Sequence, residues 1–440
     1  MSIIRNGILS ADLDVPVVLP TLNLDFANSQ SLDNRITFTR GSIGTFVNKN
    51  GLIETAPANV PRFDYDPISG ECRGLLIEEP RINNVTNSTT LSSHTNSATV
   101  DTVTTETISP DGTFNAYKIV GNAGVRIRQS IYSNSFTMSA NKSYTASVFL
   151  KGTETRRYVA IWFDSTPPGN APIEGPYYGA SVFIDLLTGT STNSSAVKMV
   201  PYGNGWYRCY ITATVGASNL TNVFFSVSMG SPNGFNDIGN SSIYKYVGDG
   251  ISGIYYWGPQ VEEGAFPTSY IPTSASTVTR SADLAQMTGT NFSSWYNQSE
   301  GTLYASAKSN ANINSLPGIA ALNNDTSPGL YRVDLRYYQG GNSYTFFNGV
   351  NGGGGLLSRT SGFLLTNPKF VTSYSNQNIS FVANGSLIRA NVPIFTPSPL
   401  VNRLLIGAFD ASQYSLNGTI SRLAYYPKRL SDAQLQYLTQ

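Results

Sequence analysis

Short stretches of alternating hydrophobic and polar residues recur along this chain, separated by turns rich in glycine, proline and asparagine. In residues 142–151, Tyr144, Ala146, Val148 and Leu150 occupy every second position. Successive side chains of a strand point to opposite sides of a sheet, so these four residues share one face. Runs of this kind predict strands at 22–26, 115–120, 158–163, 180–186, 206–213, 223–229, 251–261, 301–307, 330–338, 369–374, 379–382, 403–408 and 418–426.

The pattern predicts an all-β chain of antiparallel sandwiches, since no βαβ unit is found. Two local motifs refine this prediction near the C-terminus. The pair Asn384-Gly385 predicts a type I′ hairpin turn, because both central positions of that turn need a positive φ. Ser431 and Gln434 form a capping-box motif that predicts a short terminal helix, with Leu435 and Leu438 as its buried pair.

The spacing of these runs divides the chain of 440 residues into segments, and each sandwich is long enough to form its own core. Residues 1–83 are predicted to form an extended arm and a small β unit. Residues 84–265 are predicted to form a jelly roll, and residues 288–440 a second sandwich. Residues 266–287, with Pro267 and Pro272, are predicted to be an extended linker between the two sandwiches.

Composition excludes several classes of protein. Only 12% of the residues are charged, and the net charge is +1 without a run of Lys and Arg, so a nucleic-acid groove is not expected. No run of eighteen apolar residues predicts a membrane span. The N-terminal residues carry Asp12 and Asp14 and do not predict a secretory signal. The two cysteines, Cys72 and Cys209, lie too far apart along the chain to form a disulfide framework.

The residues offer little catalytic chemistry. His94 is the only histidine and is predicted to be an exposed loop residue, so a serine or cysteine nucleophile lacks another imidazole base. The adjacent pairs Glu78-Glu79 and Glu262-Glu263 are attractive as a glycosidase dyad. Neighbours on a strand point to opposite faces, so neither pair forms a dyad by itself. We therefore predict a non-enzymatic protein with no cofactor and no zinc site. Asp and backbone carbonyl oxygens in either sandwich could hold calcium, but no motif spacing supports such a site.

Aromatic residues provide candidates for sugar binding, because rings stack on the CH faces of sugars. The candidates are Trp162, Tyr177, Tyr178, Tyr337, Tyr338 and Tyr344. Packing of Trp162 in the core and of the tyrosines against neighbouring strands is the competing interpretation.

A further set, Arg62, Asp64 and Asp66, alternates around two aromatic residues. It predicts either a surface that docks onto another protein or a local network of ion pairs.

Several motifs resemble recurring segments of tailed-bacteriophage virion proteins. They are LDFANS at 24–29, ITFTRGS at 36–42, PRFDYDP at 61–67, GLLIEE at 74–79 and FPTSYIP at 266–272. Residues 144–151, 204–209 and 258–264 resemble the jelly rolls of carbohydrate-binding modules. Residues 292–296, 301–303 and 403–435 resemble laminin-G/concanavalin-A-like sandwiches.

The resemblance implies a structural protein on the surface of a bacteriophage virion, made in the host cytoplasm. It favours a tail-fibre or tail-tip adhesin that contacts host-surface polysaccharide. The alternatives are a capsid-attached head fibre or decoration protein without a receptor role and, less favoured, a polysaccharide depolymerase. The N-terminal region is expected to bind other virion proteins, and the resemblance to virion fibres implies a homo-oligomer, most readily a trimer.

Overall fold

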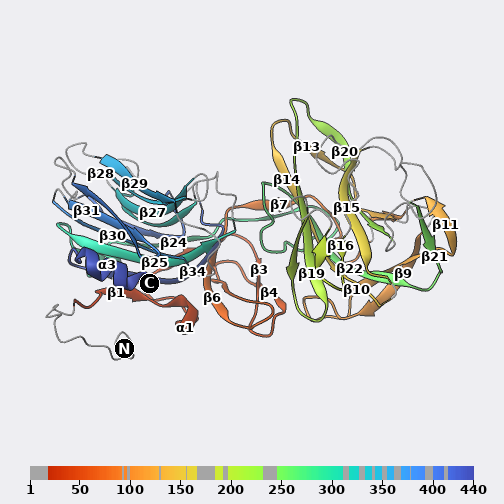
Figure 1. Ribbon diagram of the computed structural model, residues 1–440, viewed down its shortest axis with the longest axis horizontal. Helices are drawn as coiled ribbons and strands as arrows, with labels where there is room; N and C mark the ends of the chain where they lie inside the picture. The colour runs from red at the N-terminus through yellow and green to blue at the C-terminus, as the bar shows by residue number, and fades with distance from the viewer. Residues whose placement is uncertain are drawn as a thin grey trace.

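The computed structural model shows two β-sandwiches joined by a narrower connecting region (Figure 1). We call the sandwich that comes first along the chain the middle sandwich, and the other the C-terminal sandwich. The structure describes residues 18–91, 94–96, 100–127, 130–154, 156–165, 184–191, 197–230, 245–310, 317–326, 332–338, 342–348, 354–360, 368–376, 378–391, 400–410 and 415–440. Antiparallel strands dominate these residues, which confirms the predicted all-β class.

The C-terminal sandwich consists of two facing sheets. In order across the first sheet, the strands are β32 (Ser386–Asn391), β31 (Asn378–Ala383), β30 (Lys369–Ser375), β25 (Gly301–Ser309), β34 (Gly418–Tyr426), β6 (Cys72–Ile77) and β5 (Phe63–Tyr65), and β1 (Leu22–Leu24) also pairs with β34. The second sheet contains β2 (Thr37–Thr39), β24 (Leu284–Thr288), β33 (Arg403–Ile406), β26 (Gly318–Asn323), β27 (Arg332–Tyr338), β28 (Asn342–Asn348) and β29 (Gly354–Thr360).

The N-terminal strands complete this sandwich instead of forming the small separate unit expected from the sequence. Strands β1, β5 and β6 extend one sheet and β2 extends the other. These strands have only three to six residues, too few to bury a hydrophobic face among themselves. Gly74 permits the close approach, because a Cβ at this position would lie 2.0 Å from the carbonyl oxygen of Ile420. The exact residue boundaries between the units stay a prediction.

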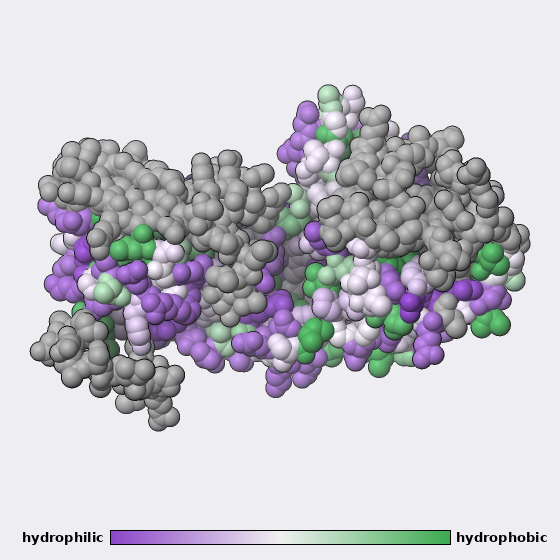
Figure 2. All heavy atoms as spheres, in the orientation of Figure 1, coloured by the Kyte–Doolittle hydropathy of each residue, from purple (hydrophilic) through white to green (hydrophobic). Residues whose placement is uncertain are grey.

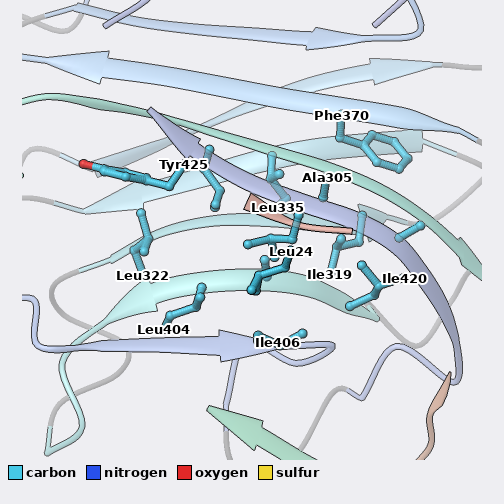
Figure 3. Packing of buried hydrophobic residues seen from close by; sticks show 14 of the residues in the cluster. Leu24, Ala305, Ile319, Leu322, Leu335, Phe370, Leu404, Ile406, Ile420 and Tyr425 are labelled. Atoms are coloured by element: carbon cyan, nitrogen blue, oxygen red, sulfur yellow. The ribbon is translucent and has the colours of Figure 1, made fainter. Parts of the chain in front are cut away.

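The core of the C-terminal sandwich mixes residues from both ends of the chain. Figure 3 shows Leu24 from β1 packed among Leu335, Ile406 and Ile420, and all four side chains are nearly inaccessible to solvent. Burying an aliphatic side chain of this size contributes about 1.5–3 kcal/mol. The N-terminal strands are therefore held in place by apolar packing as well as by their backbone hydrogen bonds.

The middle sandwich also has two sheets around a separate core. One contains β18 (Val197–Pro201), β19 (Trp206–Thr214), β14 (Ser143–Lys151), β22 (Gly253–Glu263), β10 (Ala116–Gly121) and β9 (Val100–Thr107). The other contains β17 (Thr190–Ser191), β16 (Ile184–Asp185), β15 (Tyr158–Ser165), β20 (Leu220–Met229), β12 (Ser130–Tyr132) and β8 (Thr95–Asn96), and β13 (Phe136–Met138) pairs with β20. A two-stranded ladder joins β11 (Gly124–Ile127) to β21 (Lys245–Gly248).

An aromatic cluster lies on the outer face of the first of these sheets and joins it to the N-terminal region. Phe149, Trp206 and Trp257 are buried against Tyr270 of the linker and against Ile53. Ile53 belongs to the hairpin of β3 (Gly44–Val47) and β4 (Ile53–Ala56), which lies between the two sandwiches (Figure 1). The N-terminal segment thus packs against both sandwiches.

The local motifs near the C-terminus fold as predicted. Asn384 and Gly385 have φ values of 46° and 76° and join β31 to β32, as a type I′ turn requires. Helix α3 (Asp432–Leu438) begins with the capping box of Ser431 and Gln434. Leu435 is buried, whereas Leu438 is only partly buried.

The remaining helices, α1 (Phe26–Ser29) and α2 (Thr290–Ser293), are single turns. Among the residues that the structure describes, the helices lack the length and apolar character needed to cross a membrane. On the face drawn in Figure 2, the coloured residues form small hydrophobic areas separated by hydrophilic ones.

Candidate functional site

A pocket of about 790 Å³ lies where the middle sandwich meets the strands that connect it to the C-terminal sandwich. The connection is a two-stranded ladder of β7 (Arg81–Asn83) and β23 (Val278–Arg280). The pocket is lined by Glu79, Pro80, Arg81, Ile82, Asn84, Ser143, Tyr144, Glu263, Gly264, Ala265, Phe266 and Thr279. Its volume falls in the range of roughly 300–1,000 Å³ that is typical of small-molecule sites.

Arg81 is the one cation in the wall of this pocket, and its guanidinium is held from several sides. Its Nη2 lies 2.5 Å from Oε1 of Glu79, and its Cζ lies 4.9 Å from the centre of the Phe266 ring. Gly264 leaves the space that the guanidinium occupies, because a Cβ at this position would lie 1.5 Å from Nη1. The buried Nε of Arg81 has no hydrogen-bond partner among the described residues.

Two carboxylates of the pocket wall remain accessible. The side chain of Glu79 is 32% exposed, and that of Glu263 is 51% exposed. Oε1 of Glu263 lies 2.9 Å from Nζ of Lys142, which is itself exposed. An ionised carboxylate has several acceptor positions, so each side chain can accept further hydrogen bonds from a bound molecule.

The neighbouring carboxylates, Glu78 and Glu262, point into the protein instead. Glu78 pairs with Arg62 at 2.8 Å and with Arg280 at 3.1 Å. Glu262 accepts hydrogen bonds from the side chain of Gln260 and from the backbone and hydroxyl of Thr268. In both pairs one carboxylate points inward and the other lines the pocket. Glu262 and Glu263 alternate within β22, whereas Glu78 and Glu79 lie between β6 and β7.

Glu78 and Glu262 belong to a buried polar region beside the pocket. There Asp283 joins Arg40 at 3.1 Å to Arg62 at 2.5 Å, and it also accepts the backbone N–H of Glu78. Burial by itself would raise the pKa of Glu78, but Arg280, Arg62 and hydrogen bonds from Ser269 lower this pKa to about 2. We call Arg40, Arg62, Glu78, Arg280 and Asp283 the buried ion network.

The three residues predicted as a docking surface take part in ion pairs. Arg62 is buried in the ion network and cannot contact a partner in this structure. Asp64 accepts a hydrogen bond from the backbone of Val47, and burial raises the pKa of Asp64 to about 6. Asp66 accepts backbone N–H groups of its own turn and lies 2.7 Å from Arg73. Arg62 has no accessible surface and cannot contribute to a docking surface. It pairs with Glu78 and Asp283, so the three residues do not form a local network among themselves either.

Trp162, a predicted sugar-binding residue, lies on the face of β15 that points away from the sandwich core. Its neighbours Ile161 and Phe163 belong to that core, whereas Trp162 is half-buried. Across the sheet Trp162 is aligned with Ser226, and Ser226 with Tyr132. Ser226 and Tyr132 are almost inaccessible, at 0% and 3% exposure, so this face offers little more than the indole. Sugar binding by Trp162 stays a prediction.

The predicted tyrosines divide into three groups. Tyr337 is 3% exposed, donates a hydrogen bond to the carbonyl of Ala307 and packs edge-on against Phe370. The structure contradicts its assignment to sugar binding, because the ring is part of the core. Tyr338 pairs through its backbone with Asn342, and Tyr344 with Arg336; the structure does not describe these two tyrosine side chains. Tyr177 and Tyr178 lie outside the described residues.

His94 differs from the exposed loop residue expected from the sequence. Both ring nitrogens are buried and make no hydrogen bond within the described part of the chain. The ring meets Tyr256 edge-on, with 6.2 Å between the ring centres. Burial lowers the pKa of His94 to about 4, so the ring is neutral at neutral pH.

The pocket was not predicted from the sequence. The sequence indicates Glu79 and Glu263 only as members of acidic pairs. Residues 79–84 and 263–266 are far apart along the chain, and the pairing of β14 with β22 and of β7 with β23 brings them together. The glycine at position 264, between acidic and aromatic residues, was the available indication of a close approach.

Comparisons with known proteins give only distant structural similarity. No protein-family model matches the chain, and no curated protein matches it either. The CBM40 of the Ruminococcus gnavus IT-sialidase, solved with α2,3-sialyllactose, is 18% identical; the match covers 34% of this chain and 88% of that one, with a TM-score of 0.31. The leech intramolecular trans-sialidase is 19% identical over 32% of this chain and 23% of that one, with a TM-score of 0.29.

The binding domain of botulinum neurotoxin serotype G is 10% identical over 36% of this chain and 40% of that one, with a TM-score of 0.28. Each of these matches covers about a third of this chain. Matches of this extent do not establish a ligand for this protein.

Proposed function

We propose that this protein is a non-enzymatic surface component of a bacteriophage virion that binds host-surface glycans through the pocket beside Arg81. One observation carries the glycan-binding part of this proposal. The pocket combines two accessible carboxylates with a fixed guanidinium at a junction between structural units. Sites of this kind, concave with a few convergent polar groups, are suited to small hydroxyl-bearing ligands.

The phage origin and the position on the particle have a different basis. They rest on the motifs at 24–29, 36–42, 61–67, 74–79 and 266–272, which resemble virion proteins. Attachment through the N-terminal region and assembly as a trimer rest on the same resemblance. A tail-fibre or tail-tip adhesin is the preferred form of the proposal, and a head fibre or decoration protein is the alternative. Antibody labelling of intact particles distinguishes label at the tail from label spread over the head.

Glycan binding is tested on a glycan array with the full chain, two pocket variants and one control variant. Glu79→Gln and Glu263→Gln remove one negative charge each from the pocket wall, and Glu71→Gln serves as the control because Glu71 is exposed outside the pocket. We expect binding by the wild type and by Glu71→Gln, and weakened binding by the two pocket variants. Absence of binding, or equal binding by all variants, would contradict the proposed function.

The enzymatic alternative, a polysaccharide depolymerase, is tested separately. It requires two carboxylates that act on one sugar linkage. Incubation of the protein with capsule or lipopolysaccharide from a bound host should release no reducing ends if the protein only binds. Release that is lost in Glu79→Gln or Glu263→Gln would replace the adhesin proposal with hydrolysis.

A further inference from the structure

The charges around the pocket point to the class of sugar that fits it. Arg81 is the only cation in the wall, and Glu79 already pairs with it at 2.5 Å. Glu263 contributes a second negative charge. Lys142 lies 2.9 Å from Glu263, so the two glutamates of the wall are balanced by two cations, Arg81 and Lys142. A ligand carboxylate would lie near these two carboxylates and would find both cations already paired, so it gains no free cationic partner.

A cationic ligand gains less from these carboxylates than their number suggests. Each already has a basic partner, Arg81 for Glu79 and Lys142 for Glu263. An incoming ammonium group would compete with these partners and would also lie near the Arg81 guanidinium. The ammonium group and the guanidinium would repel each other, so the pocket wall does not offer an unpaired carboxylate to a cationic ligand.

A neutral ligand that carries hydroxyl groups can form hydrogen bonds with the polar residues of the pocket wall without adding charge. Its hydroxyls can donate to Glu79 and Glu263, and charge-assisted hydrogen bonds of this kind are the stronger ones. One of its oxygens can accept from a guanidinium N–H of Arg81 that Glu79 does not take up. The exposed side chains of Pro80 and Ile82 add apolar surface against which the CH face of a sugar ring can lie.

We infer that the pocket binds a neutral hexopyranose unit and discriminates against acidic and amino sugars. This inference rests on the proposed glycan-binding function of the same pocket. Arg81 acts here as a fixed donor, since the Phe266 ring, the Glu79 carboxylate and the space left by Gly264 determine where its guanidinium lies. The fixed position of the donor lowers the entropy that binding would otherwise lose.

Saturation-transfer NMR of the full chain tests this inference, because it detects weak binding of small sugars. The neutral probes are glucose, galactose and N-acetylglucosamine; glucuronate is the acidic probe and glucosamine the cationic one. We expect at least one neutral sugar to bind about tenfold or more tightly than glucuronate and glucosamine. Raising the ionic strength should reduce the discrimination against glucuronate, because part of it is electrostatic.

Variants separate the charge argument from sugar binding in general. Glu263→Gln removes one of the facing charges, so we expect the preference for neutral sugar over glucuronate to fall several-fold. Glu71→Gln is the matched control outside the pocket, and both its sugar affinity and its sugar preference should equal those of the wild type. Trp162→Ala tests the competing site on β15.

Each other outcome has a defined meaning. If glucuronate or glucosamine binds as well as the neutral sugars and Glu263→Gln or Glu79→Gln alters that binding, the inference is overturned while glycan binding in the pocket stands. If no probe binds, or if binding is lost only in Trp162→Ala, both the inference and the assignment of the pocket are overturned.

Discussion

Two pairs of adjacent glutamates show how the same residue type is used in opposite ways. Glu78 and Glu262 are buried at 4% and 0% exposure, and their oxygens are surrounded by arginine, serine, threonine and amide groups. Glu79 and Glu263 follow them directly in the chain and line an open pocket. One carboxylate of each pair points inward and the other outward, through strand alternation in β22 and through the connection between β6 and β7.

The difference has energetic consequences. A buried charge without its partner is costly, so every member of the buried ion network depends on the others. The exposed carboxylates depend much less on their partners, because water can solvate them. We call the buried ion network the inner set, and Glu79 and Glu263 with their partners Arg81 and Lys142 the outer set. Removing a charge from the inner set should therefore lower the stability of the fold, whereas removing one from the outer set should weaken ligand binding.

The largest effect is expected for Asp283→Ala. This change leaves Arg40 and Arg62 without the carboxylate that they share, and all three side chains are fully buried. We expect a loss of about 3–5 kcal/mol in the free energy of unfolding, measured by denaturant titration. The exposed residue Glu71, changed to alanine, should stay close to the wild type. A loss below about 1 kcal/mol for Asp283→Ala would show that the network does not stabilise the fold.

Acid should weaken the same network through Glu78. Its pKa is about 2 in the folded protein and 4.5 in the unfolded chain, so the unfolded chain takes up the proton first as the pH falls. The stabilisation is complete above about pH 4.5 and is lost as the pH falls towards 2. It amounts to about 3 kcal/mol, at roughly 1.36 kcal/mol for each unit by which the pKa is lowered.

The contribution of Glu78 is measured as the difference between the wild type and Glu78→Gln across this range. The comparison is needed because Asp64 acts in the opposite direction: burial raises its pKa to about 6, so its contribution falls as the pH rises from 3.8 towards 6. Parallel pH profiles for the wild type and Glu78→Gln between pH 4.5 and 2 would contradict the assignment.

A smaller loss is expected for Gly264→Ala, which tests how the outer set is supported. Gly264 has a φ of 140° and leaves the space of the Arg81 guanidinium. A methyl group there strains the backbone and displaces Arg81, and we expect a cost of about 2 kcal/mol together with weaker sugar binding. Gly216→Ala is the control, because a Cβ at that position meets nothing within 4 Å. Equal stability of the two variants would show that Arg81 moves freely.

The sequence predicts the strands and the local turns well, because their causes are local. The period of two, the Asn384-Gly385 turn and the capping box of Ser431 each depend on residues close together in the chain. The partners of the N-terminal strands could not be predicted in this way. Their apolar residues fit a core built from strands hundreds of residues later, as the pairing of Leu22 with Tyr425 shows.

The candidate site was less predictable than the fold for the same reason. Tyr337 alternates with its neighbours as a surface or a core residue would, and only the packing against Phe370 decides between the two. Arg62 alternates with Asp64 along the chain, yet its partner Asp283 lies 221 residues away. Nothing local to residues 79–84 indicates that Gly264 and Phe266 will complete a pocket there.

The smallest effect is expected for Lys142→Ala, and it tests the outer set most directly. Lys142 and Glu263 lie 2.9 Å apart, but their side chains are 54% and 51% exposed, so water screens the pair and can solvate either charge alone. We expect an unfolding midpoint equal to that of the wild type within error, while Glu263 still accepts hydrogen bonds from a sugar. If Lys142→Ala destabilised the protein as strongly as Gly264→Ala, the outer carboxylates would be structural like the inner ones. The contrast between neighbouring glutamates would then have no functional meaning.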